Sequence, residues 1–345
     1  QSLKKMDYHL ELSEHLHNLA GSDDFPHLFF YGPPGAGKKT RIMALLRQLF
    51  GPGVEKLHVE KRSFKLPNKS DTVEATCIVS SHHIELSPSE SGYHDRVIVQ
   101  EVIKGIAESH HLDTGGPNNR PFKVVVLNEV DMLSKDAQNA LRRTMEKYMT
   151  NCRLILCASS ITKVIEALRS RCLCLRVAAP GYDEIVSVIN DIGKKEGFTV
   201  PEALAYKIAA KSGRNLRRAL LMLEATKVKQ FPFTEDQAVQ LPDWLEFTNH
   251  IGRIILDQQT PAQLLSVREK FYELLTHCIP HDVILTTLTS YLLEKVDNEL
   301  KHEVIEVAAK CEHRMAKGTK PIFHLEAFAA KIMELYKGFM LRFME

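Results

Sequence analysis

The amino-acid sequence predicts an α/β domain built on a parallel sheet, followed by a small helical domain and an all-α bundle. In the first half of the chain, short apolar segments alternate with helical patterns, the order expected of strands that pair in parallel. From Tyr182 onward no convincing strand is present, and apolar residues recur at helical spacing. The segment Phe231–Pro242 contains two prolines and acidic residues, which is typical of a linker.

The elements of the α/β domain, residues 1–179, follow in chain order. Apolar segments predict strands at Leu28–Tyr31, Thr76–Val79, Phe122–Leu127, Leu154–Ala158 and Cys172–Val177. Helical spacing predicts helices at about 40–50, 94–109 and 135–149.

Two helical parts are expected after this domain. Residues 180–232 are expected to hold short helices, interrupted at Gly193, at Gly197 and at Ser212-Gly213. Residues 243–345 are expected to form the bundle, since apolar residues there fall at helical spacing: Phe271, Leu274, Leu275 and Ile322, Leu325, Phe328, Ile332.

Composition and charge narrow the class of protein. Charged residues make up 26% of the chain, and no apolar run reaches the roughly 18 residues that span a bilayer, so a membrane protein is not expected. The seven cysteines include no C-x-x-C pair, which argues against a zinc module and a disulfide framework and indicates a reducing compartment. Two basic clusters, residues 38–69 and 207–229, are consistent with a solvated face or with an anionic polymer as partner. Because the chain starts at Gln1 without a secretory signal, a leader or short N-terminal segment is expected to precede it.

A Walker A motif, or P-loop, follows the first predicted strand and opens a helix. It reads Gly32-Pro33-Pro34-Gly35-Ala36-Gly37-Lys38. Its glycines let the backbone curl so that amides from Gly35 to Lys38 point at phosphate oxygens, and the helix N-terminus favours an anion. The Lys38 ammonium supplies a point charge to the terminal phosphates. The motif predicts a site for ATP or ADP.

The metal ligands of this site depart from the usual pattern. Lys39 stands where a Ser or Thr hydroxyl normally ligates magnesium, and Thr40 is rotated by roughly 100° around the helix from that position. At the end of the strand Phe122–Leu127, Asn128 replaces the Walker B Asp, whereas Glu129 keeps the general-base position. Weak or absent Mg²⁺ binding is expected.

Further motifs resemble one family. Ser134–Glu146 looks like the helix after Walker B in clamp-loader small subunits, which are AAA+ ATPases. Leu168–Cys172 resembles their Ser-Arg-Cys motif, and Ser212–Arg218 resembles their sensor 2 helix. The runs Tyr272–Pro280 and Ile322–Phe328, together with the Gly-Lys-Lys-Thr P-loop, are similar to replication factor C subunit three of animals, called subunit five in yeasts. The resemblance covers nearly the whole chain.

The resemblance implies roles for several residues. Arg171 is implied to be an arginine finger that enters a neighbouring subunit's ATP site, and Arg217 to be the sensor 2 arginine. Ser159 stands near the place of a sensor 1 Asn that positions water. With Lys39 and Asn128 this makes three departures from a competent site, so the chain is expected to hold nucleotide and to hydrolyse it little or not at all.

The resemblance also implies partners. It implies an AAA+ domain, a helical lid and a collar that assembles with other replication factor C subunits into a heteropentameric sliding-clamp loader, acting in replication and repair in the nucleus. Primer–template DNA is expected at Arg96, Lys104 and Lys135, because tracking of duplex needs phosphate contacts. The clamp, proliferating cell nuclear antigen, is expected near Glu85–His94. The family's N-terminal Trp-x-x-Lys-Tyr-Arg-Pro stretch is absent, so part of the adenine pocket has no counterpart in the sequence.

Two other functions fit parts of the sequence. A self-assembling AAA+ ATPase that remodels DNA or protein complexes fits Glu129 and Arg171, but not Lys39, Asn128 and Ser159. A protein-binding scaffold with an AAA+ shell predicts no nucleotide affinity, which the intact P-loop contradicts.

Overall fold

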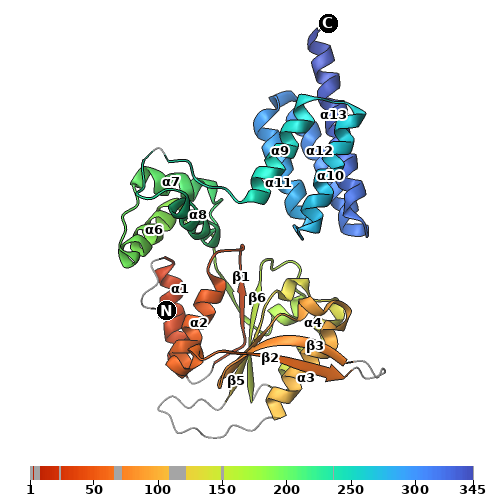
Figure 1. The fold of residues 1–345 in the computed structure, drawn as a ribbon. Helices are drawn as coiled ribbons and strands as arrows, with labels where there is room; N and C mark the ends of the chain where they lie inside the picture. The colour runs from red at the N-terminus through yellow and green to blue at the C-terminus, as the bar shows by residue number, and fades with distance from the viewer. Residues whose placement is uncertain are drawn as a thin grey trace. The chain divides into compact units, whose positions relative to one another are not determined.

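The computed structural model describes residue 3 and residues 8–22, 25–65, 72–108, 122–148, 151–235 and 237–344. Residues 109 and 149, which end two predicted helices, and residue 236 of the predicted linker lie outside these ranges. The chain forms two compact units, Gln1–Val239 and Gln240–Glu345, called here the N-terminal and C-terminal units (Figure 1). Within the described ranges, no helix has the length and apolar character needed to cross a bilayer.

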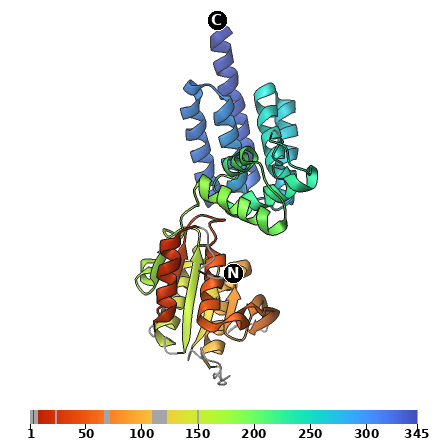
Figure 2. The same cartoon turned by 90° about the vertical axis from the view of Figure 1, so that its left-hand side faces the viewer.

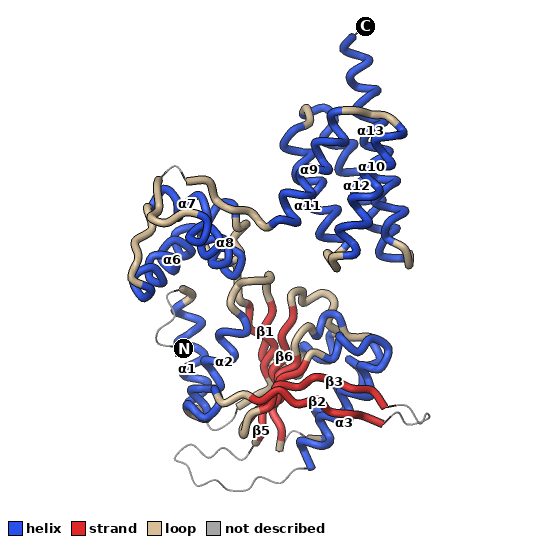
Figure 3. The backbone as a smooth tube through the Cα atoms, viewed as in Figure 1, coloured by secondary structure: helices blue, strands red, loops and turns tan. Residues whose placement is uncertain are grey.

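The described part of the N-terminal unit contains a seven-stranded sheet in the order β2-β3-β4-β5-β6-β1-β7. Figure 3 shows its strands in red. The strands are β1 Leu28–Tyr31, β2 His58–Lys65, β3 Thr72–Val79, β4 His83–Leu86, β5 Lys123–Leu127, β6 Cys152–Ala158 and β7 Leu173–Arg176. The predicted strands β5, β6, β1 and β7 pair in parallel with one another, and β5 also pairs in parallel with β4, which was not predicted. The predicted strand Thr76–Val79 lies in β3, which is antiparallel to its neighbours and not parallel as expected, because it forms a ribbon with the unpredicted β2 at the β4 edge.

Helices cover both faces of this sheet, and the apolar residues of β1 show why. Leu28 and Phe30 pack into one buried cluster with residues of α1 (Leu10–Gly21) and α2 (Lys38–Phe50). Phe29, between them, packs into a second cluster with residues of α3 (Asp95–Glu108) and α4 (Lys135–Lys147). Successive side chains of a strand point to opposite faces, so a continuous apolar run needs a helical layer on each side.

The other helices of this unit are short or belong to its last part. They are η2 Pro52–Glu55, η3 Pro88–His94, η4 Val130–Met132, α5 Glu166–Arg169, α6 Tyr182–Glu196, α7 Glu202–Lys211 and α8 Leu216–Lys229. The predicted break at Gly193 is wrong, because α6 continues through it to Glu196. A Cβ at Gly193 would lie 2.8 Å from the Phe198 carbonyl oxygen, so this glycine allows the chain to pack closely after the helix. The breaks at Gly197 and at Ser212-Gly213 are confirmed.

The C-terminal unit consists of five helices within residues 240–344, and they run side by side (cyan to blue in Figure 2). They are α9 Asp243–Asp257, α10 Pro261–Thr276, α11 His281–Lys295, α12 Asn298–Lys317 and α13 Pro321–Met344. Apolar residues from all five form one buried cluster, in which Phe271, Leu288 and Phe328 are fully buried. The helical spacing seen in the sequence therefore marks the inward face of the bundle.

We expect Phe271→Ala to destabilise the C-terminal unit by about 3–5 kcal/mol, because Phe271 is fully buried and its removal leaves a cavity. The free energy of unfolding is measured by urea titration of the full chain. The fluorescence of Trp244, the single tryptophan of the sequence, reports on this unit because Trp244 packs against the same cluster. Tyr272→Ala, on the same helix but exposed, is the matched control, and a loss as large as that of Phe271→Ala would contradict the assigned core.

Candidate nucleotide-binding site

A pocket of about 290 Å³ lies beside the P-loop. It is lined by Pro34, Gly35, Gly37, Lys38, Lys39, Thr40, Ser87, Asn128, Glu129, Cys157, Ala158, Ser159 and Arg217. The pocket thus brings together the loop after β1, the segments that follow β5 and β6, and the first turn of α8. Parallel strands present their carboxyl ends at one edge of the sheet, the usual place for a ligand in such folds. Every predicted nucleotide-contacting residue lines the pocket except Gly32 and Ala36.

The P-loop has the backbone of an anion cradle. Gly35 and Gly37 have φ values of 73° and 82°, which L side chains rarely adopt. Gly32 and Ala36 support the loop from behind: a Cβ at Gly32 would lie 1.9 Å from the Val177 carbonyl oxygen, and Ala36 is buried. The loop therefore has the curled backbone that a phosphate needs and leads directly into the N-terminus of α2, so these residues fit a nucleotide.

Lys38 is the cation of this cradle. Its Nζ donates to the carbonyl oxygens of Gly32 at 2.6 Å and Pro33 at 2.9 Å. Burial lowers the pKa of the Lys38 ammonium, and the charge of Arg217 acts in the same direction. Lys38 is partly buried and Arg217 is exposed; both line the pocket, where their positive charges attract phosphate oxygens.

The positions that usually hold magnesium do not fit a metal. The Lys39 ammonium forms an ion pair with Oε1 of Glu85, a residue of β4 that is 3% exposed. The Asn128 Nδ2 donates to the same oxygen at 2.7 Å. The Glu85 carboxylate is therefore already paired with a cation and an amide donor. Among the described residues there is also no group of three or more His, Cys, Asp or Glu that could hold a metal ion.

Glu129 and Ser159 lie at the ends of neighbouring strands. Glu129 is exposed, has a left-handed backbone (φ 52°), and accepts a hydrogen bond from Ser89 Oγ at 3.1 Å. The backbone N–H groups of Ser159 and Ser160 donate to Asp131 Oδ2 at 3.1 and 3.2 Å. Asp131 thus joins the segment after β5 to the segment after β6 and fixes where the Ser159 hydroxyl can reach.

Three residues that hold the side chains of the site in place, Glu85, Ser89 and Asp131, were not predicted from the sequence, and neither were the lining residues Ser87, Cys157 and Ala158. Glu85 and Ser89 fall in the segment assigned to the clamp, and Asp131 was given no role. The sequence gives no clear signal for Glu85, because Ile84, Glu85 and Leu86 alternate as in a strand with one face toward solvent. The partners that allow its burial come from distant parts of the chain.

A second pocket, of about 580 Å³, lies behind the P-loop. It is lined by Tyr8, His9, Leu10, Glu11, Leu12, Arg176, Ala178 and Glu184. Tyr8 Oη donates to the Ala36 carbonyl oxygen at 3.2 Å, and His9 Nε2 lies 3.3 Å from the Ala178 carbonyl oxygen. The segment before α1 therefore packs against the P-loop and the end of β7, although the sequence left this side of the site without assigned residues.

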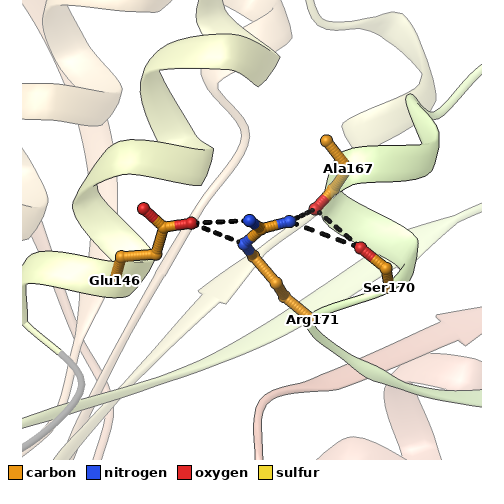
Figure 4. Close-up of polar contacts among 4 residues, drawn as sticks. All are labelled: Glu146, Ala167, Ser170 and Arg171. Carbon is orange, nitrogen blue, oxygen red and sulfur yellow. Dashed lines mark hydrogen bonds and ion pairs between the residues drawn. The ribbon is translucent and has the colours of Figure 1, made fainter.

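Arg171 lies outside the residues that line the nucleotide pocket of its own chain. It follows α5, and its guanidinium is held by three groups (Figure 4). Nε and Nη2 each lie 2.7 Å from Glu146 Oε1, while Nη1 donates to the Ala167 carbonyl oxygen at 2.7 Å and to Ser170 Oγ at 3.3 Å. The side chain is 38% exposed, so it is oriented by its own chain and open to a partner.

Arg96, Lys104 and Lys135 are exposed cations on α3 and α4. Buried Asp95 brings the first turns of these two helices together, because it accepts the Ser134 N–H at 2.7 Å and the Ser134 hydroxyl at 3.0 Å. Arg96 follows Asp95 and Lys135 follows Ser134, so both cations lie at adjacent helix N-termini. Lys104 lies further along α3.

The fold and the first pocket define a P-loop ATPase of the AAA+ class: a parallel sheet, a P-loop after β1, polar residues after β5 and β6, and an arginine from a small helical domain. Family models match along the chain: "DNA polymerase III, delta subunit" at residues 8–180, "RCF1/5-like, AAA+ ATPase lid domain" at 187–228, and "Replication factor C subunit 3, C-terminal domain" at 244–340.

Relatives with high identity cover almost the whole chain. Replication factor C subunit 3 of Homo sapiens is 53% identical over 98% of this chain and 94% of its own length. Replication factor C subunit 5 of Oryza sativa subsp. japonica is 49% identical over 99% and 96%, and subunit 5 of Schizosaccharomyces pombe is 47% identical over 97% and 94%. The chain belongs to the replication factor C subunit 3 family, whose members in rice and this yeast are numbered 5.

A solved structure supports the fold independently. The RuvB Holliday junction branch migration motor of Thermotoga maritima aligns with a TM-score of 0.52 at 15% identity, covering 87% of this chain and 96% of that one. At this identity the likeness concerns the fold alone.

Proposed function

We propose that this chain holds a nucleotide in a site of little or no hydrolysis and completes the ATP site of a neighbouring subunit with Arg171. Its family makes it a subunit of the clamp loader of DNA replication. The observation that carries the finer proposal is the pairing of Lys39 and Asn128 with Glu85 in the chain's own site, while Arg171 lies outside that site.

The chain's own site lacks groups that hydrolysis needs. Glu129 retains a carboxylate that can activate water, but Ser159 lacks the amide that would help to position it. Lys39 and Asn128 stand where the usual magnesium ligands would be and both pair with Glu85, so the γ-phosphate would lack the protein-held magnesium that neutralises its charge during hydrolysis. The same contacts argue against a self-assembling ATPase, which needs a competent site and a finger in one chain.

The surroundings of Arg171 support a role in trans. An arginine finger acts by placing its planar guanidinium against the phosphoryl group as charge develops there. Arg171 is fixed by Glu146, Ala167 and Ser170 and is partly exposed, so a neighbour could bury it with little further loss of side-chain freedom.

The three parts of the chain have different roles in this proposal. We propose residues 1–179 as the ATPase domain, 180–232 as the lid that contributes Arg217, and 243–345 as the collar that binds other replication factor C subunits. Primer–template DNA and the sliding clamp, proliferating cell nuclear antigen, are the further partners, with the clamp near Glu85–His94 and the complex in the nucleus.

The experiment that tests the proposed function is clamp- and DNA-stimulated ATP turnover. It is measured on the reconstituted complex that carries either Arg171→Ala or Lys38→Ala in this chain. Strong loss with the first and little loss with the second supports a donor in trans. The reverse pattern would mean that this chain hydrolyses ATP itself.

Arg96→Ala and Lys135→Ala are each expected to weaken binding of primer–template DNA by the complex equally for all sequences, and to reduce the salt slope of log affinity by about one unit. The physical reason is that each removes one phosphate contact at the paired N-termini of α3 and α4. Affinity is measured by fluorescence anisotropy at several salt concentrations. Lys310→Ala on α12 is the control for loss of an exposed lysine. If the salt slope of log affinity is unchanged in both variants, this face of α3 and α4 does not contact DNA phosphates.

A further inference from the structure

Lys39 and Asn128, which replace two residues of the usual metal site, both contact Glu85. Its side chain is 4% exposed, and its Oε1 receives both the Lys39 ammonium and the Asn128 amide. Lys39 comes from the first turn of α2 and Asn128 from the end of β5, so the two residues are far apart in sequence. Each substitution alone looks like a loss, but together they form one hydrogen-bonded cluster, the Lys39–Glu85–Asn128 cluster.

The charge of the buried Glu85 carboxylate is compensated only while both Lys39 and Asn128 are present. A buried carboxylate is costly unless a cation and hydrogen-bond donors compensate it, and Lys39 and Asn128 supply both. An Asp in place of Asn128 would set two carboxylates against each other at about the 2.7 Å now spanned by the amide hydrogen bond. A divalent cation at this position would have to displace the ammonium from Glu85.

The cluster also faces the nucleotide pocket. Lys39 and Asn128 both line the pocket, and the Lys39 side chain is 53% exposed. An ammonium has three N–H donors arranged around one point charge, so it can pair with Glu85 and still donate to a phosphate oxygen. It lies next in sequence to Lys38, whose Nζ is held at the P-loop carbonyls.

We propose that the Lys39 ammonium, fixed by Glu85 and Asn128, replaces Mg²⁺ as the counterion of the bound phosphates, so that this chain binds its nucleotide without a divalent cation. The inference rests on the proposed nucleotide binding and deepens it. A metal-dependent P-loop loses phosphate affinity when its cation is removed, because the metal bridges and neutralises the phosphate oxygens. A lysine that is part of the protein cannot be removed by a chelator.

The test is equilibrium titration of the full chain with a fluorescent ADP analogue, once in excess MgCl₂ and once in EDTA. The expected dissociation constants agree within about threefold, a difference of less than 1 kcal/mol. Binding that is at least about tenfold weaker in EDTA would overturn the inference while leaving nucleotide binding intact. Absence of binding in both buffers would overturn the proposed nucleotide binding together with the inference.

Two variants assign the effect to the cluster. Lys39→Thr/Glu85→Gln/Asn128→Asp restores the usual metal ligands without setting two carboxylates against each other, and is expected to make binding at least about tenfold weaker in EDTA than in MgCl₂. Lys39→Met/Glu85→Gln removes both charges, so no buried carboxylate is left unpaired, and is expected to weaken binding in EDTA by about tenfold or more relative to the unaltered chain.

The matched control is Glu306→Gln/Lys310→Met, which removes an exposed ion pair of α12 and should leave both dissociation constants unchanged. Circular dichroism checks that each variant is folded. If folded Lys39→Met/Glu85→Gln binds the analogue in EDTA as tightly as the unaltered chain, Lys39 is not the counterion and the inference fails.

Discussion

Arg171→Ala is expected to lower ATP turnover at the neighbouring site by about 10³-fold or more, the range found for arginine fingers. The guanidinium is held in place before any partner arrives, and alanine removes both its charge and its planar donor set. Turnover is measured with clamp and DNA in the reconstituted complex. The other hydrolytic sites are silenced by substitution of their P-loop lysines, so that only the site next to Arg171 contributes.

Two companion variants make this result specific. Glu146→Gln removes the ion-pair partner of Arg171 but keeps the arginine itself. Because an exposed ion pair of this kind contributes about 1 kcal/mol or less, we expect turnover to change by at most about fivefold. Lys38→Ala empties the chain's own site and leaves the neighbour's chemistry nearly unchanged. A drop with Lys38→Ala as large as with Arg171→Ala would show that this chain's own site does the chemistry.

The parallel core of the fold could be predicted because its signals are local. Strands such as Leu28–Tyr31 are short apolar runs that need helices on both faces, and the P-loop follows one of them directly. Strand β2 carries no such signal, because it is paired only with β3, its described side chains are mostly exposed, and half of them are charged. Strand β4 is four residues long and includes the buried polar side chains of His83 and Glu85, so its composition hides its position inside the sheet.

The candidate site shows the same division between local and distant information. The sequence alone showed that magnesium ligands are missing, because Lys39 and Asn128 each occupy a motif position whose usual residue binds the metal. That both contact Glu85 could not be predicted, because the contact depends on β4 lying beside β5. The orientation of Arg171 likewise depends on Glu146 in α4, which is adjacent only in three dimensions. Its role in a neighbour's site stays a prediction.

Two buried histidines give the second large expected effect, a loss of stability at mildly acidic pH. His27 is 5% exposed and His83 is 1% exposed. Burial lowers the pKa of each imidazole to about 4. At His27 the Arg153 charge lowers the pKa further. At His83 the charges of His82 and Lys39 also lower the pKa, whereas the charge of Glu85 raises it. His27 Nδ1 accepts the Leu154 N–H at 3.0 Å, so protonation of that nitrogen also removes a hydrogen bond to β6.

The direction follows from comparing the folded and unfolded chains. The pKa is about 4 in the folded chain and 6.5 in the unfolded one. Between these values the unfolded chain binds protons that the folded chain does not, so stability is complete above the higher value and is lost as the pH falls toward the lower one. From about pH 7 to about pH 5 the N-terminal unit is expected to lose about 2 kcal/mol per histidine.

The two histidines can be tested separately from the carboxylates that titrate in the same pH range. His27→Asn keeps an acceptor for the Leu154 N–H, and His83→Asn keeps an amide that can pair with the Ser80 hydroxyl; both remove the titrating group. Urea unfolding followed by circular dichroism at several pH values should show a shallower loss of stability for each variant than for the unaltered chain. His302→Asn, on an exposed position of α12, is the control and should follow the unaltered chain. Parallel pH curves for His27→Asn, His83→Asn and the unaltered chain would mean that these imidazoles take up protons equally in the folded and unfolded states, because only a difference in proton binding between the two states makes stability depend on pH.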